Sequence, residues 1–157
     1  GNPDCKVLFI GEAPGKQEDM QGRPFVGRSG QFLDRELEAI GWRREDIYIT
    51  NIVKRRPPEN RDPTPKEIAA YRPYLERQIE IIAAPIVVTL GRFAMHYFLP
   101  DATISRDHGA TFRVDGLLVV PFYHPATASR FPRIFAQFDV DLRRLPAMVR
   151  GSEKRES

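Results

Sequence analysis

The sequence predicts an α/β protein, a three-layer α/β/α sandwich around a mainly parallel sheet of four strands. Segments with apolar residues at helical spacing separate short apolar runs that are typical of strands buried on both faces. These runs are residues 6–10, 47–53, 86–90 and 117–122. Strands that alternate with helices in this way form parallel sheets with helices on both faces. A chain of 157 residues can bury the core of one such domain.

The first half of the chain contains two strands and the helix between them. The strand at 6–10 ends at Gly11, and Ser29 is placed to cap a helix that runs to about Ile40. Gly41 supplies the stop signal for that helix. The β-branched run at 47–53 then predicts the second strand.

A second helix and a third strand follow a proline-rich basic loop. Residues 64–67 (TPKE) combine an N-cap, a proline at the first helical position and a glutamate three residues after the cap. The helix is expected to run to about Ala83. It leads into the strand at 86–90 and a short helix over 92–98.

The last part of the chain is predicted to form a hairpin and a long helix. Asp115-Gly116 is a hairpin turn signal between 111–114 and the fourth strand. One helix is expected from about Arg133 to Val149. We place the single domain at 1–150 and expect 151–157 to be a flexible polar tail.

Composition limits the classes of function. The net charge of +3 is compatible with an anionic partner such as DNA, but many proteins without such a partner share it. No apolar stretch approaches the roughly 20 residues that span a membrane, and the first four residues lack the basic and apolar regions of a secretory signal. We therefore expect a soluble protein of the cytoplasm, with no membrane partner. The single cysteine, Cys5, is interpreted as a small buried hydrophobic residue.

Four segments directly follow the predicted strands. Ligands of open α/β sheets bind at the carboxyl ends of the strands, so these segments are expected to gather along one edge. They are residues 11–15, Asn51, residues 91–92 and residues 124–125. Taken singly, each also has an ordinary structural reading, such as a tight turn, a helix cap or a hydrogen-bonded core histidine.

The order of these motifs along the chain indicates the function more strongly than any single motif does. The set comprises residues 11–15 (GEAPG), 22–30 (GRPFVGRSG), Asn51 with the segment to 63, 89–92 (TLGR) and 124–125 (HP). Over residues 1 to about 130 it closely resembles the family 4 uracil-DNA glycosylases. That resemblance implies the fold of this family and a monofunctional DNA glycosylase acting in base excision repair. It also implies a monomer that acts on single- or double-stranded DNA containing uracil and releases free uracil.

The resemblance further implies roles for particular residues. Phe25 would stack on the extruded base, and the Asn51 amide would match the N3 proton and O4 of uracil. His124 would donate a hydrogen bond to uracil O2 as charge develops there, and Glu12 would position the attacking water. The expected catalytic residues are Glu12, Asn51 and His124, and the expected uracil-binding residues are Gly11, Ala13, Gly15, Phe25, Asn51 and His124. Phosphates of DNA are expected to contact Arg55, Arg56, Gly91, Arg92 and Arg130.

Two departures from the family pattern qualify these expectations. The family holds a 4Fe-4S cluster on four cysteines, and the two ligand positions inside this chain are Arg55 and Tyr71, neither of which ligates iron. We therefore expect no cluster, no other metal and no cofactor, with Tyr71 filling the vacated space. The leucine that the family inserts into the duplex is also absent. Either Arg130 or Phe131 replaces it, or the enzyme favours single-stranded DNA.

Two other functions remain open at this point. A glycosylase-like domain without cluster and wedge can persist as a binding module for uracil-DNA that does not turn over. The enzyme can also act on another deaminated base, such as hypoxanthine or xanthine. Assays of several deaminated bases side by side distinguish these hypotheses.

Overall fold

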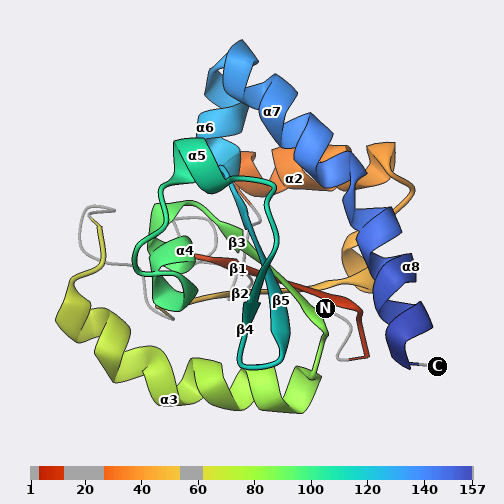
Figure 1. Ribbon diagram of the computed structural model, residues 1–157. Helices are drawn as coiled ribbons and strands as arrows, with labels where there is room; N and C mark the ends of the chain where they lie inside the picture. The colour runs from red at the N-terminus through yellow and green to blue at the C-terminus, as the bar shows by residue number, and fades with distance from the viewer. Residues whose placement is uncertain (1–3, 13–26, 54–61, 157) are drawn as a thin grey trace.

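A computed structural model describes residues 4–12, 27–53 and 62–156, which form a central sheet between two layers of helices (Figure 1). The strand order is β2-β1-β3-β5-β4. The strands are β1 Val7–Gly11, β2 Tyr48–Asn51, β3 Ile86–Leu90, β4 Phe112–Val114 and β5 Leu117–Phe122. All pairs are parallel except β4 with β5. The predicted α/β sandwich is confirmed, with five strands instead of four, because the first arm of the hairpin joins the sheet.

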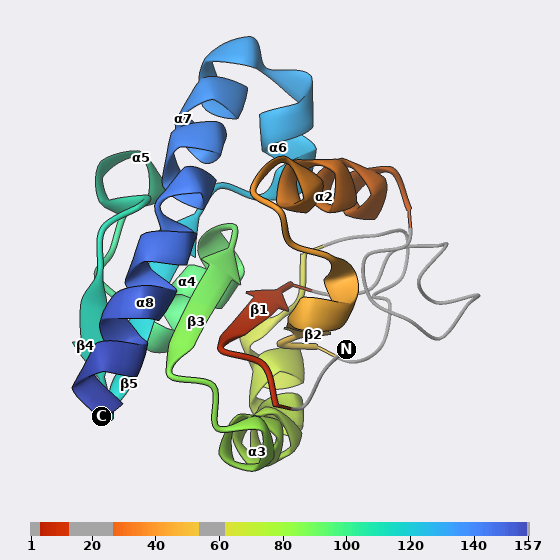
Figure 2. The same ribbon diagram turned by 90° about the vertical axis from the view of Figure 1, so that its right-hand side faces the viewer.

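The helices divide between the two faces of the sheet (Figures 1 and 2). Their bounds are α2 Arg28–Ala39, α3 Pro65–Ile82, α4 Arg92–Phe98, α5 Ile104–Asp107, α6 Pro125–Arg130, α7 Pro132–Arg143 and α8 Leu145–Glu156, with the 3₁₀ turn η1 at Arg44–Asp46. One core cluster joins the sheet to α2, α6, α7 and α8, and the other joins it to α3 and α4.

Alternation along the strands explains the two cores. Phe9 of β1 belongs to the first cluster, whereas its neighbours Leu8 and Ile10 belong to the second. Successive side chains of a strand point to opposite faces, so a strand covered by helices on both sides is apolar at every position. All five residues of β1 and of β3 are buried accordingly.

Of the two helix N-caps that we predicted, the one at Thr64 is confirmed and the one at Ser29 is not. The Thr64 and Glu67 capping box of α3 is confirmed, because the Glu67 N–H donates to Thr64 Oγ1 at 3.1 Å and the Thr64 N–H donates to Glu67 Oε1 at 3.0 Å. The expected cap at Ser29 is wrong. Gly27 is the N-cap of α2, and Ser29 lies inside its first turn.

The C-terminal segment differs from the single helix that we expected. The expected helix over residues 133–149 is divided into α7, which ends at Arg143, and α8, which has Pro146 as its second residue. The short helix α6 precedes them and was not expected. A proline starts a helix readily but cannot continue one, because it lacks an N–H and its ring clashes with the preceding turn. The helix α8 includes residues 151–156, where we expected a polar tail. Among the described helices, none has the length and apolar character needed to cross a membrane.

Candidate active site

The carboxyl ends of four parallel strands meet at one edge of the sheet. Glu12 follows β1, Asn51 ends β2, Gly91 follows β3, and His124 follows β5 by two residues. Strand pairing places Asn51 beside Gly11. The chain moves from β1 to β2 on one side and later to β3 on the other, so the strand order switches between β1 and β3. Such a switch point opens a crevice at the strand ends.

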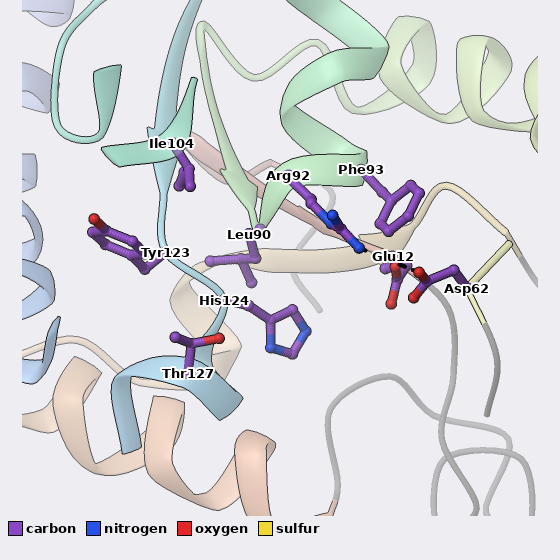
Figure 3. A pocket seen from close by; sticks show the side chains of 10 residues that line it. Glu12, Asp62, Leu90, Arg92, Phe93, Ile104, Tyr123, His124 and Thr127 are labelled. Carbon is purple, nitrogen blue, oxygen red and sulfur yellow. Dashed lines mark hydrogen bonds and ion pairs between the residues drawn. The ribbon is translucent and has the colours of Figure 1, made fainter. Parts of the chain in front are cut away.

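A pocket of about 260 Å³ occupies this edge (Figure 3). A water molecule takes about 30 Å³ in the liquid, so the pocket has room for a group of nucleobase size. The described residues that line it are Glu12, Asp62, Leu90, Gly91, Arg92, Phe93, Ile104, Tyr123, His124 and Thr127. Asn51 is buried one strand away from Glu12 and is not among them.

His124 projects into the pocket from the turn between β5 and α6 (Figure 3). It is the N-cap of α6, and its Nδ1 accepts a hydrogen bond from the Ala126 N–H at 3.0 Å. Burial lowers the pKa of the imidazole to about 4. The ring is therefore neutral near pH 7, and because Nδ1 is an acceptor, its proton resides on Nε2. This arrangement presents a neutral N–H donor.

Gly91 lies against the His124 ring. Its φ of 89° and ψ of 172° fall in a region that is open essentially to glycine alone. A Cβ at this position would lie 3.1 Å from His124 Cβ and 3.3 Å from Cδ2. The Gly91 N–H, which we expected to face a phosphate, donates to Phe122 O at 2.9 Å. The structure thus gives Gly91 a role in packing His124, and its contact with DNA stays a prediction.

Substitution of Gly91 tests this packing. We expect Gly91→Ala to lower the free energy of unfolding by about 1–3 kcal/mol, because alanine is strained at this φ and ψ. Gly151→Ala is the matched control, since a Cβ at Gly151 meets open space within α8. The control is expected to be neutral or slightly stabilising. Urea denaturation of both variants measures the difference, and equal stabilities would contradict the account.

Charged groups surround Glu12 on the other side of the pocket (Figure 3). The Arg92 guanidinium pairs with Asp62 at 3.2 Å between Nη2 and Oδ2 and lies 4.8 Å from the centre of the Phe93 ring. Burial raises the pKa of the Glu12 carboxyl, the nearby Asp62 carboxylate raises it further, and Arg92 lowers it. Glu12 is thus a poorly solvated carboxylate at the strand end, suited to accept a proton from water.

Several predicted site residues lie outside the described residues: Ala13, Gly15, Phe25, Arg55 and Arg56. Arg130 is exposed at the end of α6. Tyr71 packs against the core on the α3 side, with its ring 6.3 Å from that of Tyr74. Glu12, Gly91, Arg92 and His124 line one pocket, whereas Gly11 and Asn51 lie at the same edge of the sheet but outside the pocket lining.

Sequence reasoning predicted four of the ten described residues that line the pocket and missed the other six. Tyr123 and Thr127 flank the His-Pro motif, and Asp62 lies in the segment that resembles the family, so their neighbourhood was a usable signal. Phe93 directly follows the predicted Arg92. Ile104 comes from α5, which no sequence signal pointed to.

Comparison with known proteins identifies the family. A family model described as "Uracil DNA glycosylase superfamily" matches residues 1–145. The chain belongs to the uracil-DNA glycosylase superfamily. It is 42% identical to the type-4 uracil-DNA glycosylase of Archaeoglobus fulgidus, over 92% of this chain and 77% of the relative. It is 46% identical to the type-4 enzyme of Thermotoga maritima, over 80% of this chain and 67% of the relative. The predicted membership of family 4 is confirmed.

The iron-sulfur cluster of this family does not fit the residues present. The sequence contains one cysteine, and arginine and tyrosine occupy the inner ligand positions 55 and 71. Cys5 is buried just before β1, at the opposite end of that strand from Glu12, and burial raises the pKa of its thiol. A thiol ligates iron as the thiolate, so this environment opposes ligation. Within residues 4–12, 27–53 and 62–156, no three His, Cys, Asp or Glu side chains form a group that could hold a metal ion.

Proposed function

We propose that this superfamily member is a monofunctional glycosylase that hydrolyses the N-glycosidic bond of uracil in DNA. It acts as a monomer of the prokaryotic cytoplasm and needs no bound cofactor. The observation that carries the proposal is a neutral imidazole donor and a poorly solvated carboxylate lining one pocket at the switch point of the sheet. The names of the relatives identify uracil in DNA as their substrate.

Departure of the base leaves negative charge on uracil while the sugar becomes cationic. In our proposal the Nε2–H of His124 donates to uracil O2 and stabilises the electron pair that leaves with the base. A neutral donor suits this task, since it need not be protonated first. Water adds to C1′ of the sugar, and its proton passes through the Glu12 carboxylate to the uracil anion. The C1′–N1 bond breaks and a C1′–O bond forms.

Selection of uracil falls to Asn51 in this proposal. Uracil presents an N3 proton and an O4 acceptor, which a side-chain amide matches with its oxygen and its NH₂ group. Cytosine presents the opposite pattern and would leave buried polar groups unpaired, at about 1–3 kcal/mol each. Burial of Asn51 at the end of β2 supports this role, because strand pairing holds its backbone beside Gly11.

Phosphates of the DNA are expected to contact the arginines around this edge. Arg92 is about two-thirds exposed and stays within reach of solvent despite its ion pair with Asp62. Exposed ion pairs are weak, so a phosphate can replace Asp62 as the partner of Arg92. Arg55, Arg56 and Arg130 are further proposed contacts, together with Gly91.

Release of free uracil from oligonucleotides tests the function. The expected result is free uracil and an alkali-labile abasic site from a single-stranded uracil substrate, with no release from matched thymine or cytosine substrates. Hypoxanthine and xanthine substrates belong in the same assay, because preference for either would replace uracil as the target. Tight binding of uracil-DNA with no turnover would overturn the proposal in favour of a binding module.

The pH dependence of the rate tests the role of Glu12. If ionised Glu12 accepts the proton of water, kcat/KM falls at low pH with the pKa of this carboxyl. Asp62 raises that pKa, so Asp62→Asn is expected to move the acidic limb of the profile to lower pH. Asp101→Asn, at an exposed position away from the pocket, is the control and should leave the profile unchanged. If the acidic limb of the pH profile does not move in Asp62→Asn, Glu12 is not the group that accepts the proton of water.

Phe131 is our candidate for the residue that enters the duplex. Its side chain is 50% exposed between α6 and α7, next to the exposed Arg130. His124 and Phe131 cap the two ends of α6, and a rise of about 1.5 Å per residue separates their backbones by about 10 Å along the helix axis. An exposed aromatic ring at this distance can stack in the gap left by the extruded base.

Strand preference measures this role. We expect Phe131→Ala to slow uracil release from double-stranded DNA about tenfold, a change of about 1.4 kcal/mol. Release from single strands should be nearly unchanged, because no base pair has to be opened. Ile81→Ala, an exposed apolar residue on α3, is the control. Equal losses on both substrates would assign Phe131 to general binding.

A further inference from the structure

A buried polar pair lies behind the wall of the pocket, outside the groups used in the proposed chemistry. His108 Nδ1 lies 2.7 Å from Asp141 Oδ2, with side chains that are 18% and 4% exposed. The two residues are 33 positions apart and join the end of α5 to α7. The carboxylate can only accept, so the Nδ1–H donates. Removing such a pair from water is costly, and the pair alone is weak support for stability.

The backbone around His108 is held on both sides. The Gly109 N–H donates to Pro121 O of β5 at 2.8 Å. Gly109 has a φ of 77°, and a Cβ there would overlap Asp141 Oδ1. Only glycine lets α7 approach this turn so closely. The backbone at residues 108–109 is therefore hydrogen-bonded to β5 on one side and packed against Asp141 on the other.

Tyr123 connects the His108–Asp141 pair to the pocket, because it contacts His108 and also lines the pocket. The ring centres of His108 and Tyr123 are 5.0 Å apart, with 39° between the planes. Tyr123 lines the pocket on the side away from Glu12, and His124 follows it directly (Figure 3). One turn before Asp141, Phe138 packs on Phe122 of β5 with ring centres 5.4 Å apart. The helix α7 thus fixes the two residues that precede His124, one through Phe138 and the other through His108.

We propose that His108 and Asp141 are positioning residues that set the place of Tyr123 and, through it, of the His124 imidazole in the pocket. The inference rests on the proposed function, because its consequence is a rate of uracil release. Neither side chain lines the pocket, so their loss should change the geometry of the reaction and leave the DNA-binding surface intact. Misplacement of a reacting group by about 1 Å can cost about 100-fold in rate.

Kinetics of matched variants test the proposal. Asp141→Ala and His108→Ala are expected to lower kcat about 10- to 100-fold while KM for a uracil oligonucleotide stays nearly unchanged. Asp141→Asn keeps an oxygen that accepts from His108 and should restore most of the rate. Leu75→Ala removes a fully buried side chain of α3 in the core on the other face of the sheet, and serves as a control for lost stability alone. All rates are measured at a temperature where circular dichroism shows every variant folded.

The imidazole resonances of His124 give a readout that is independent of turnover. In ¹⁵N-labelled protein, Asp141→Ala should shift the ring signals of His124, whereas Leu75→Ala should leave them in place. Unchanged kcat and unchanged His124 signals in Asp141→Ala would overturn the proposal, as would an equal loss of kcat in Leu75→Ala. If the wild-type protein releases no uracil, the proposed function fails, and these signals still decide whether the pair positions His124.

Discussion

Asn51→Ala is expected to lower the rate of uracil release by about 100- to 1000-fold, the range found when one preorganised polar group of an active site is removed. The amide is buried at the end of β2, held beside Gly11 by strand pairing. In the proposed function its loss would remove both hydrogen bonds that distinguish uracil and leave the polar edge of a bound base unpaired. Single-turnover assays on a uracil oligonucleotide measure the loss.

A variant of the adjacent residue controls for damage to the strand. Thr50 is also buried, and its Oγ1 lies 3.0 Å from Gln78 Oε1 of α3. Thr50→Val alters β2 on the face opposite to Asn51, because neighbouring side chains of a strand point to opposite sides. We expect it to retain the rate of uracil release. If Asn51→Ala and Thr50→Val release uracil at similar rates, Asn51 does not select the substrate.

His124→Ala is expected to reduce the rate by a similar 100- to 1000-fold, equivalent to about 2.7–4 kcal/mol of lost transition-state stabilisation. Because the Ala126 N–H donates to Nδ1, the proton of the neutral ring is on Nε2, from which we propose that it is donated to uracil O2. His96→Gln is the control, as His96 contacts Ala102 O away from the pocket. Retention of the rate in His124→Ala would exclude the imidazole from the reaction.

The depressed pKa of His124 makes the pH dependence informative. Since the folded pKa is about 4, the ring stays neutral above pH 5, and the rate should not fall as pH rises through 6.5. Such a fall would indicate a protonated donor. In the unfolded chain the His124 imidazole binds a proton near pH 6.5, whereas in the native state it binds one only near pH 4. Burial of His124 therefore makes stability decline as pH falls from 6.5 to 4, and His124→Gln should reduce that decline.

Local patterns of residues were enough to predict the type and order of most elements and the residues at their ends. The apolar runs at 6–10 and 86–90 predicted strands covered on both faces, and the capping box of Thr64 and Glu67 marked the start of α3. Once the strands were taken as parallel, their carboxyl ends had to share an edge. This placed Glu12, Asn51 and His124 together without any knowledge of their side-chain contacts. These features depend on local propensity and on a period of two or 3.6 residues.

The formation of a pocket at this edge depends on how the elements pack in three dimensions. This packing brought Asp62 and Ile104 to the rim, joined β4 to the sheet, and divided the expected last helix at Arg144 into α7 and α8. The neutral state of His124 follows from burial and from a hydrogen bond, and the pairing of His108 with Asp141 spans 33 residues. Burial and long-range contacts depend on how elements pack, and no local pattern of residues encodes them.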